Sequence, residues 1–277
     1  MSDSPRLRVS ELLREAELTG DKYLIVEGPT DRIFYGRWIA KLPGTGTPSV
    51  KVVSVDTIDV PSDDLHMAGL SDGNRSRVML LSTYVDRSKT DVICIADRDC
   101  GHNTASYISD AMLWTDFPAL ESYAFDADVL DWLNAMILGG LLPAAASMMT
   151  SLTGVFLDLF TVRLHNEDLP APNIARGFPS SKDPSAFDVA KTVHSSLSAA
   201  VPLYARPSFS DPREVVYGHD IAEVMMCVFG NVIKNKSAIS GTLSLERVLR
   251  AGLLSDGSLH KTPMFQTLAI WSAPATV

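Results

Sequence analysis

The sequence predicts an α/β fold in which a parallel sheet with helices on both faces is followed by a mostly α-helical domain. The main observation is a pair of short, β-rich and uncharged runs, Tyr23–Val26 and Val92–Ala96. Such runs are typical of strands that are buried on both faces of a parallel sheet. Strand and helix patterns alternate up to about residue 120, and strand signals then fade. We therefore expect a domain over residues 1–125 and a second, mostly helical domain over residues 126–277.

The first elements follow from local signals. Apolar residues at helical spacing predict a helix over Val9–Leu18, and Gly20 marks its end. The apolar run Tyr23–Val26 predicts the first core strand, which we expect over Lys22–Glu27. Thr30 or Asp31 is a suitable cap for the next helix, which we expect to continue to Leu42.

The rest of the first domain repeats this alternation. The valine content of Val50–Val55 predicts a second strand, whereas the acidic stretch Asp56–Asp72 is expected to be an irregular surface loop. A helix is expected over Arg75–Ser88, before the strand Val92–Ala96, and Ala111–Thr115 is expected to be a short fourth strand.

Helical patterns dominate the second half. We expect helices over Asp128–Leu138, Pro143–Leu164, Pro184–Ala199, His219–Lys234, Leu245–Leu253 and Pro263–Ser272. The stretch Trp132–Leu157 contains no charged residue and is long enough to span a bilayer. Gly139, Gly140 and Pro143 interrupt it, so we expect two buried helices and no membrane span. Part of this apolar stretch is expected to form a subunit interface, because large apolar patches seldom stay exposed.

Composition narrows the function classes. The chain has 277 residues, ordinary hydrophobic content and a net charge of −9, which disfavours nucleic-acid binding through a broad basic surface. Three scattered cysteines do not form a disulfide framework and indicate a reducing compartment. The polar start Met1–Arg6 lacks the apolar core of a signal peptide. We therefore expect a cytoplasmic protein.

Acidic residues follow both core strands. Glu27 ends the first run, and Asp97 and Asp99 end the other. Because ligands of open parallel sheets bind beyond the carboxyl ends of the strands, we expect the three carboxylates to meet at one edge. Converging carboxylates repel each other, and Mg²⁺ or Mn²⁺ relieves this repulsion. The alternative for Asp97-Arg98-Asp99 is a solvated turn, since Asp and Gly are routine turn formers.

This pair of motifs resembles the TOPRIM domain shared by topoisomerases, primases and OLD-type nucleases, in which a lone Glu-Gly follows the first strand and Asp-x-Asp follows a later one. Glu27-Gly28 and Asp97-Arg98-Asp99 fill these positions. The segment Val26–Tyr35, Gly73-Asn74-Arg75 and Leu120–Tyr123 resemble the stand-alone TOPRIM effectors of bacterial anti-phage systems. The resemblance covers about the first half of the chain.

The resemblance implies a Mg²⁺-dependent nuclease acting on DNA or RNA, including tRNA, as a toxic effector in antiviral defence. The chain has no P-loop of its own, so a separate ABC-type ATPase is the implied regulator. The implied roles, with the surrounding residues considered, are these: catalytic Glu27, Asp31, Asp97 and Asp99; metal-binding Glu27, Asp97, Asp99 and Glu121; substrate-binding Gly28, Asn74, Arg75, Arg98 and His219.

Several of these residues have simpler interpretations. Asp31 and Glu121 suit the first turn of a helix, where negative charge is favoured. The segment Gly218-His219-Asp220 is better explained by Asp220 capping the helix that begins there than by a site role for His219. For the whole protein, two other classes stay open: a non-catalytic TOPRIM module for assembly or nucleic-acid binding, and a phosphate-handling enzyme acting on small nucleotides.

Overall fold

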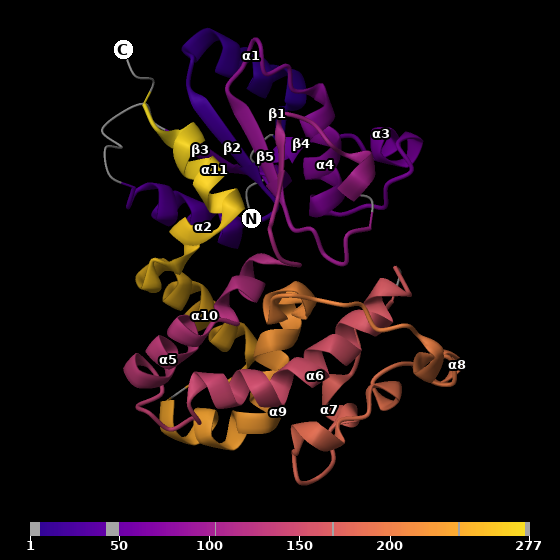
Figure 1. The fold of residues 1–277 in the computed structure, drawn as a ribbon. Helices are drawn as coiled ribbons and strands as arrows, with labels where there is room; N and C mark the ends of the chain where they lie inside the picture. Colours follow the sequence, from indigo (N-terminus) through magenta and orange to yellow (C-terminus); the bar gives the residue numbers. More distant parts are fainter. Residues whose placement is uncertain (1–5, 43–49, 103, 168, 238, 275–277) are drawn as a thin grey trace. The chain divides into compact units, whose positions relative to one another are not determined.

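The computed structural model describes residues 6–42, 50–102, 104–167, 169–237 and 239–274. The chain divides into two compact units (Figure 1). The sheet unit comprises Met1–Asp97, Asn103–Thr115 and His260–Val277, and the helical unit comprises Arg98–His102 and Asp116–Leu259. The sequence places a single boundary after residue 125, whereas this grouping returns the last helix to the sheet unit.

The predicted parallel sheet is confirmed. Its four strands are β2 (Lys22–Val26), β3 (Val50–Ser54), β5 (Val92–Ala96) and β6 (Met112–Trp114), in the order β3-β2-β5-β6. Every neighbouring pair is parallel, and Leu24 of β2 lies opposite Val52 on one side and Ile93 on the other. The carboxyl ends of all four strands therefore lie at one edge of the sheet.

Helices cover both faces of the sheet. Residues of α1 (Val9–Thr19) and α4 (Asn74–Tyr84) share one apolar core with Tyr23 and Ile25. Leu24 and Val26 alternate with these residues, so they point to the other face, and they are also buried. The helix α2 (Pro29–Ile39) packs against β3 and against α11 (Pro263–Ser272).

An aromatic cluster joins α2 and α11. The ring of Phe265 in α11 stacks on Tyr35 and meets Trp38 edge-on, with centroid distances of 5.9 and 4.9 Å. At the other end of α11, the Trp271 indole donates to Asp91 over 2.6 Å, and Lys22 donates to the Trp271 carbonyl. These contacts attach the C-terminal helix to the sheet unit.

One prediction for the sheet unit is wrong. The stretch Asp56–Asp72 is not an irregular loop, because it contains β4 (Ile58–Asp59) and α3 (Ser62–Met67). The strand β4 pairs in parallel with β1 (Leu7–Arg8), and Leu65 of α3 is fully buried. Elements of two and six residues are too short to show a clear hydrophobic period, so the sequence pattern does not reveal them.

The helical unit contains α5 (Ala127–Met136), α6 (Ala145–Leu164), α7 (Ile174–Gly177), α8 (Ser195–Ser198), α9 (Gly218–Ser237) and α10 (Thr242–Asp256). Short 3₁₀ helices at Leu120–Ala124, Val201–Leu203 and Pro212–Val215 accompany them, and a further one, Ser258–Lys261, lies where the chain passes to the sheet unit. The four expected helices around α5, α6, α9 and α10 are confirmed.

The expected helix over Pro184–Ala199 is wrong. Three separate turns occupy this stretch: Pro184–Ala186, Val189–Lys191 and α8. The side chains of Asp183, Asp188 and His194 accept hydrogen bonds from the backbone N–H groups two residues ahead. Such local bonds compete with a continuous helix, which explains why the chain restarts three times.

The apolar stretch Trp132–Leu157 divides into two helices, as predicted. Shortly after the end of α5, Gly139 and Gly140 have φ values of +65° and +73°, so the chain turns there. The Asn134 side chain exchanges two hydrogen bonds with the backbone of Leu142 across this turn. Within the described part of the chain, one helix, α6, is long and apolar enough to cross a membrane. Half of its apolar window is buried inside the protein, and a single helix of this kind is weak evidence for a membrane span.

Two glycines of α9, Gly218 and Gly230, differ in how closely they are packed. A Cβ on Gly218 would lie 2.5 Å from the Cβ of Ala119 and 3.0 Å from Oε2 of Glu121, whereas a Cβ on Gly230 would meet open space. We expect Gly218→Ala to lower the free energy of unfolding by about 1–3 kcal/mol through overpacking. Gly230→Ala should be neutral or stabilise by up to about 1 kcal/mol. Urea denaturation measures both; equal effects would contradict the packing around Gly218.

Candidate functional site

The carboxyl edge of the sheet brings two predicted residues together. Glu27 directly follows β2, and Asp97 directly follows the neighbouring strand β5. An Oε1 atom of Glu27 accepts a hydrogen bond from the backbone N–H of Asp97 over 2.8 Å. Both residues are half-buried. The pairing of the two strands therefore fixes the Glu27 carboxylate against the start of the Asp97 loop.

Arg75 stabilises the same loop from α4. Its Nε donates to the carbonyl of Asp97 over 2.8 Å, and its guanidinium lies 5.2 Å from the ring centroid of Trp114 at the end of β6. Asn74 precedes it as the first residue of α4. Arg75 thus holds backbone that carries an acidic residue, a role that differs from the predicted contact with substrate phosphate. Trp114 was not predicted, because nothing in the sequence distinguishes it from other strand residues.

Gly28 and Asp31 form the start of α2. An Oδ2 atom of Asp31 accepts a hydrogen bond from the backbone N–H of Gly28 over 3.1 Å. Gly28 has an extended backbone with φ −142°, and an added Cβ would meet Asp31 Oδ2 at an ordinary 3.5 Å. The capping interpretation of Asp31 therefore accounts for its position. Its catalytic role and the substrate contact of Gly28 stay predictions.

We expected the side chains of Asp97 and Asp99 to point to the same side of one extended strand, and this expectation is wrong. That expectation assumed an extended strand through both residues. However, β5 ends at Ala96, and Asp99 has a left-handed backbone with φ +51°. The N–H of Asp99 donates to the carbonyl of Pro118 over 2.8 Å, within the helical unit. Asp97 and Asp99 therefore belong to different units, and extended geometry does not align them.

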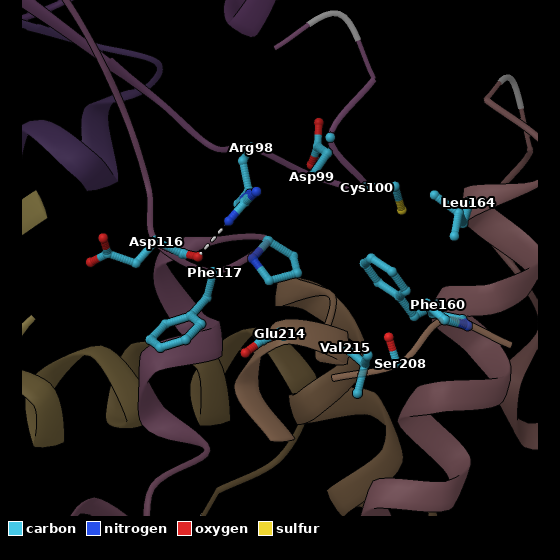
Figure 2. A pocket seen from close by; sticks show the side chains of 13 residues that line it. Arg98, Asp99, Cys100, Asp116, Phe117, Phe160, Leu164, Ser208, Glu214 and Val215 are labelled. Carbon is cyan, nitrogen blue, oxygen red and sulfur yellow. Dashed lines mark hydrogen bonds between the residues drawn. The ribbon is translucent and has the colours of Figure 1, made fainter. Parts of the chain in front are cut away.

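A cavity of about 370 Å³ lies in the helical unit (Figure 2). Its lining includes the predicted residues Arg98 and Asp99 together with Phe160, Ser208 and Glu214. In Figure 2 the ring of Phe160 lies between Cys100 on one side and Ser208 and Val215 on the other. Arg98 is exposed, and its guanidinium donates to the backbone carbonyl of Asp116 over 2.8 Å. The cavity is thus bounded by both charged and aromatic side chains.

A buried group of polar residues belongs to the same unit. Arg163 donates to both carboxylate oxygens of Asp220, at 2.5 and 3.2 Å, and its guanidinium lies 4.1 Å from the ring centroid of Tyr217. Burial raises the pKa of the Tyr217 phenol, and the negative charge of Asp99 adds to this rise. The sequence suggested only a capping role for Asp220. Its pairing with Arg163, 57 residues away, has no local sequence signal.

Glu121 is also part of an ion pair. It lies in the 3₁₀ helix Leu120–Ala124 and is 2 % exposed. Its Oε1 accepts a hydrogen bond from Nε of Arg250 over 2.6 Å, and Nη2 of Arg250 lies 2.5 Å from the same oxygen. A buried carboxylate needs such a partner. The ion pair accounts for Glu121 without a metal, and its role as a second-metal ligand stays a prediction.

His219 is on the surface of α9. Its side chain is 74 % exposed, and Nδ1 lies 3.1 Å from Glu246 Oε1. The predicted substrate contact of His219 therefore depends on a surface position within the helical unit, and nothing in that position supports it.

The donor chemistry of Glu27 and Asp97 fits Mg²⁺ or Mn²⁺. In the described ranges, no group of three or more His, Cys, Asp or Glu side chains is arranged to hold a metal ion. However, Mg²⁺ usually takes only one or two protein carboxylates and keeps several of its waters. Glu27 and Asp97, at neighbouring strand ends, provide that number of carboxylates.

Comparisons of the sequence with known protein-family models and with curated proteins give no match. The TOPRIM resemblance therefore depends on the motifs themselves and on the strand ends where the structure places them.

The ion pair between Glu121 and Arg250 gives a stability prediction. Arg250→Met removes the guanidinium and leaves a buried carboxylate without this partner, so we expect the free energy of unfolding to fall by about 3–5 kcal/mol. Arg14→Met is the matched control, because it breaks the exposed pair with Glu17 and should cost at most about 1 kcal/mol. Adding Glu121→Gln to Arg250→Met should recover part of the loss. Similar urea midpoints for both arginine variants would contradict a structural role for the pair.

Proposed function

We propose that the chain is a divalent-metal-dependent nuclease whose reaction centre includes Glu27 and Asp97. The observation that supports this most is the hydrogen bond from the Asp97 N–H to Glu27, at the carboxyl edge of a parallel sheet. In such sheets this edge is where ligands bind. The order of the Glu-Gly and Asp-x-Asp motifs along the chain is a second support, because it resembles the order in TOPRIM nucleases.

The residues around the edge suit phosphodiester hydrolysis. A bound Mg²⁺ or Mn²⁺ would stabilise charge on the phosphate and lower the pKa of a water molecule. Glu27 would accept a proton from the attacking water, and its bond to the Asp97 amide keeps its carboxylate oriented. Arg75 positions the Asp97 loop through the carbonyl of Asp97.

The cellular role follows from the resemblance alone. Stand-alone TOPRIM effectors suggest a toxic cytoplasmic nuclease of antiviral defence that is held by a separate ABC-type ATPase, with DNA or RNA, including tRNA, as substrate. The net charge of −9 agrees with contacts that are local to the site. The apolar surface around the end of α5, where Met136 and Ile137 are exposed, suits the proposed subunit interface.

Two observations favour the alternative of a non-catalytic assembly or binding module. Within the described residues, no three-residue ligand group is formed, and a strongly negative chain attracts nucleic acid poorly. Metal binding separates the two functions, because an assembly module has no need for a loaded metal site.

The test uses substitutions that preserve shape. Glu27→Gln and Asp97→Asn keep hydrogen-bonding groups in place and remove one negative charge each. We expect Mn²⁺ binding by calorimetry to weaken at least about tenfold and nuclease activity to fall by about 10²-fold or more. Their unfolding free energies should stay close to that of the wild type, since Gln can still accept from the Asp97 N–H.

Glu17→Gln is the control, because Glu17 is an exposed acid on α1 that pairs with Arg14 one turn away. Its metal binding and activity should match those of the wild type. If Glu27→Gln, expressed together with the ATPase partner, is as toxic to the cell as the wild type, the nuclease proposal is excluded. Unchanged Mn²⁺ binding in both site variants would exclude the metal site.

A further inference from the structure

A second cavity of the helical unit has a volume of about 300 Å³. Its lining comes from α6, from the 3₁₀ helices Val189–Lys191 and Val201–Leu203, and from the segment that follows the second of them. The volume is at the lower end of the range of small-molecule pockets. A compact ligand therefore fits this cavity better than a large one.

Asp158, on α6, is a recessed acid of this lining. Its side chain is 18 % exposed, whereas that of Arg206, whose Nη2 lies 2.5 Å from Oδ1 of Asp158, is 64 % exposed. Within the described residues, no donor forms a hydrogen bond with Oδ2 of Asp158. Burial raises the pKa of the Asp158 carboxyl, and the charge of Arg206 offsets this rise only in part. A carboxylate in this position has the capacity to bind a further cation.

Asp188 supplies a second acid to the same cavity. Its Oδ1 accepts a hydrogen bond from the N–H of Ala190 over 3.1 Å, and its Oδ2 lies 3.2 Å from Nζ of Lys191. Because Lys191 is largely exposed, this ion pair is a weak surface contact that a ligand can replace. With Arg206, the described lining has two carboxylates and one guanidinium, a net charge of −1. This charge attracts a cation and disfavours a phosphate.

The hydroxyl groups of the lining are engaged within the protein. Thr161 Oγ1 donates to the carbonyl of Leu157 over 2.7 Å, and the Tyr204 hydroxyl donates to Oδ1 of Asn166 over 3.3 Å. The ring of Tyr204 stacks on His165, with a centroid distance of 4.6 Å. Polar recognition in this cavity therefore depends on the two carboxylates and on Arg206.

Apolar walls decide which kind of cation fits. Val162, Val189 and Val201 line the cavity, and Val162 and Val201 are buried. Mg²⁺ keeps several of its waters, and valine side chains offer no hydrogen bonds to such a shell. An aliphatic ammonium ion suits both parts of the lining, because its N–H groups donate to carboxylates and its methylene groups are buried against valine.

We propose that this cavity binds a small aliphatic amine, with its ammonium group on Asp158 and its carbon chain against the valines. A lysine side chain of a partner protein presents the same chemistry. We assign the cavity to a free amine because Asp158 is recessed and the volume is that of a small-molecule pocket. Amine binding needs neither metal nor cleavage, so this inference is independent of the proposed nuclease.

The experiment measures binding to the full-length protein by calorimetry and saturation-transfer NMR, at about pH 8, where carboxylates and amines are both ionised. Putrescine is the probe. Butanediol of the same chain length is the matched control ligand, because hydroxyl groups replace its two amino groups. We expect saturable putrescine binding in the millimolar range or below, and diol binding at least about tenfold weaker.

Two aspartate substitutions locate the binding. Asp158→Asn keeps the shape of the side chain and removes its charge, so putrescine binding should weaken about tenfold or more. Asp128→Asn is the matched control, since Asp128 is exposed in the same unit and outside the cavity lining. It should leave binding unchanged. Thermal unfolding of both variants checks that the fold is retained.

Arg206→Met tests the sign of the charge that the cavity selects. Arg206 competes with a cationic ligand for Asp158, so its removal should strengthen putrescine binding at least about threefold. A ligand that is held through the guanidinium, such as an anion, would instead lose affinity in this variant. Because Arg206 is exposed, its replacement leaves the packed core unchanged.

Four results would overturn the proposal: no saturable putrescine binding by the folded protein, equal binding of putrescine and butanediol, equal affinity in Asp158→Asn and Asp128→Asn, or weaker binding in Arg206→Met. A lysine-containing peptide that binds more tightly than putrescine would also overturn it, and would assign the cavity to a partner protein. Putrescine binding without Mn²⁺ binding would contradict the nuclease and retain the amine site, and the opposite result would do the reverse.

Discussion

The pairing of β2 with β5 is the interaction on which the candidate site depends. Because the strands are parallel neighbours, the residues that follow them emerge at the same edge, and Glu27 reaches the backbone of Asp97. Both strands are buried on both faces, so a shift of register by one residue would exchange the two packed faces and move Glu27 away from the Asp97 amide. The packing of the sheet thereby specifies the position of an acidic side chain.

The opposite edge of the sheet shows how the last helix is held. Asp91, immediately before β5, accepts from the indole of Trp271 and from Arg87, both over 2.6 Å. Lys22, the first residue of β2, donates to the carbonyls of Trp271 and Ala273 at the end of α11. A cation at a helix C-terminus is favoured by the helix dipole. These polar contacts fix one end of α11, while the aromatic cluster around Phe265 packs the rest of it.

The helical unit uses a different device, in which charged groups are buried as pairs. Arg163 binds Asp220, and Arg250 binds Glu121, and all four side chains are largely removed from solvent. Desolvation makes such pairs costly to form and very costly to break. They therefore favour one arrangement of the helices over other apolar packings. The acids that line the cavity, Asp99, Asp116 and Glu214, are instead partly exposed to solvent.

The sequence by itself determined the parallel sheet and most of the helices. Strand and helix periods in Lys22–Val26, Val92–Ala96 and Pro263–Ser272 are local properties, set by side-chain spacing and by caps such as Asp31. It also placed Glu27 and Asp97 at strand ends. Tertiary structure alone decided the partners: Arg75 for the Asp97 carbonyl, Arg250 for Glu121, and Arg163 for Asp220. Residues up to 129 positions apart form these contacts, and their pairing depends on how the elements pack, which no local period encodes.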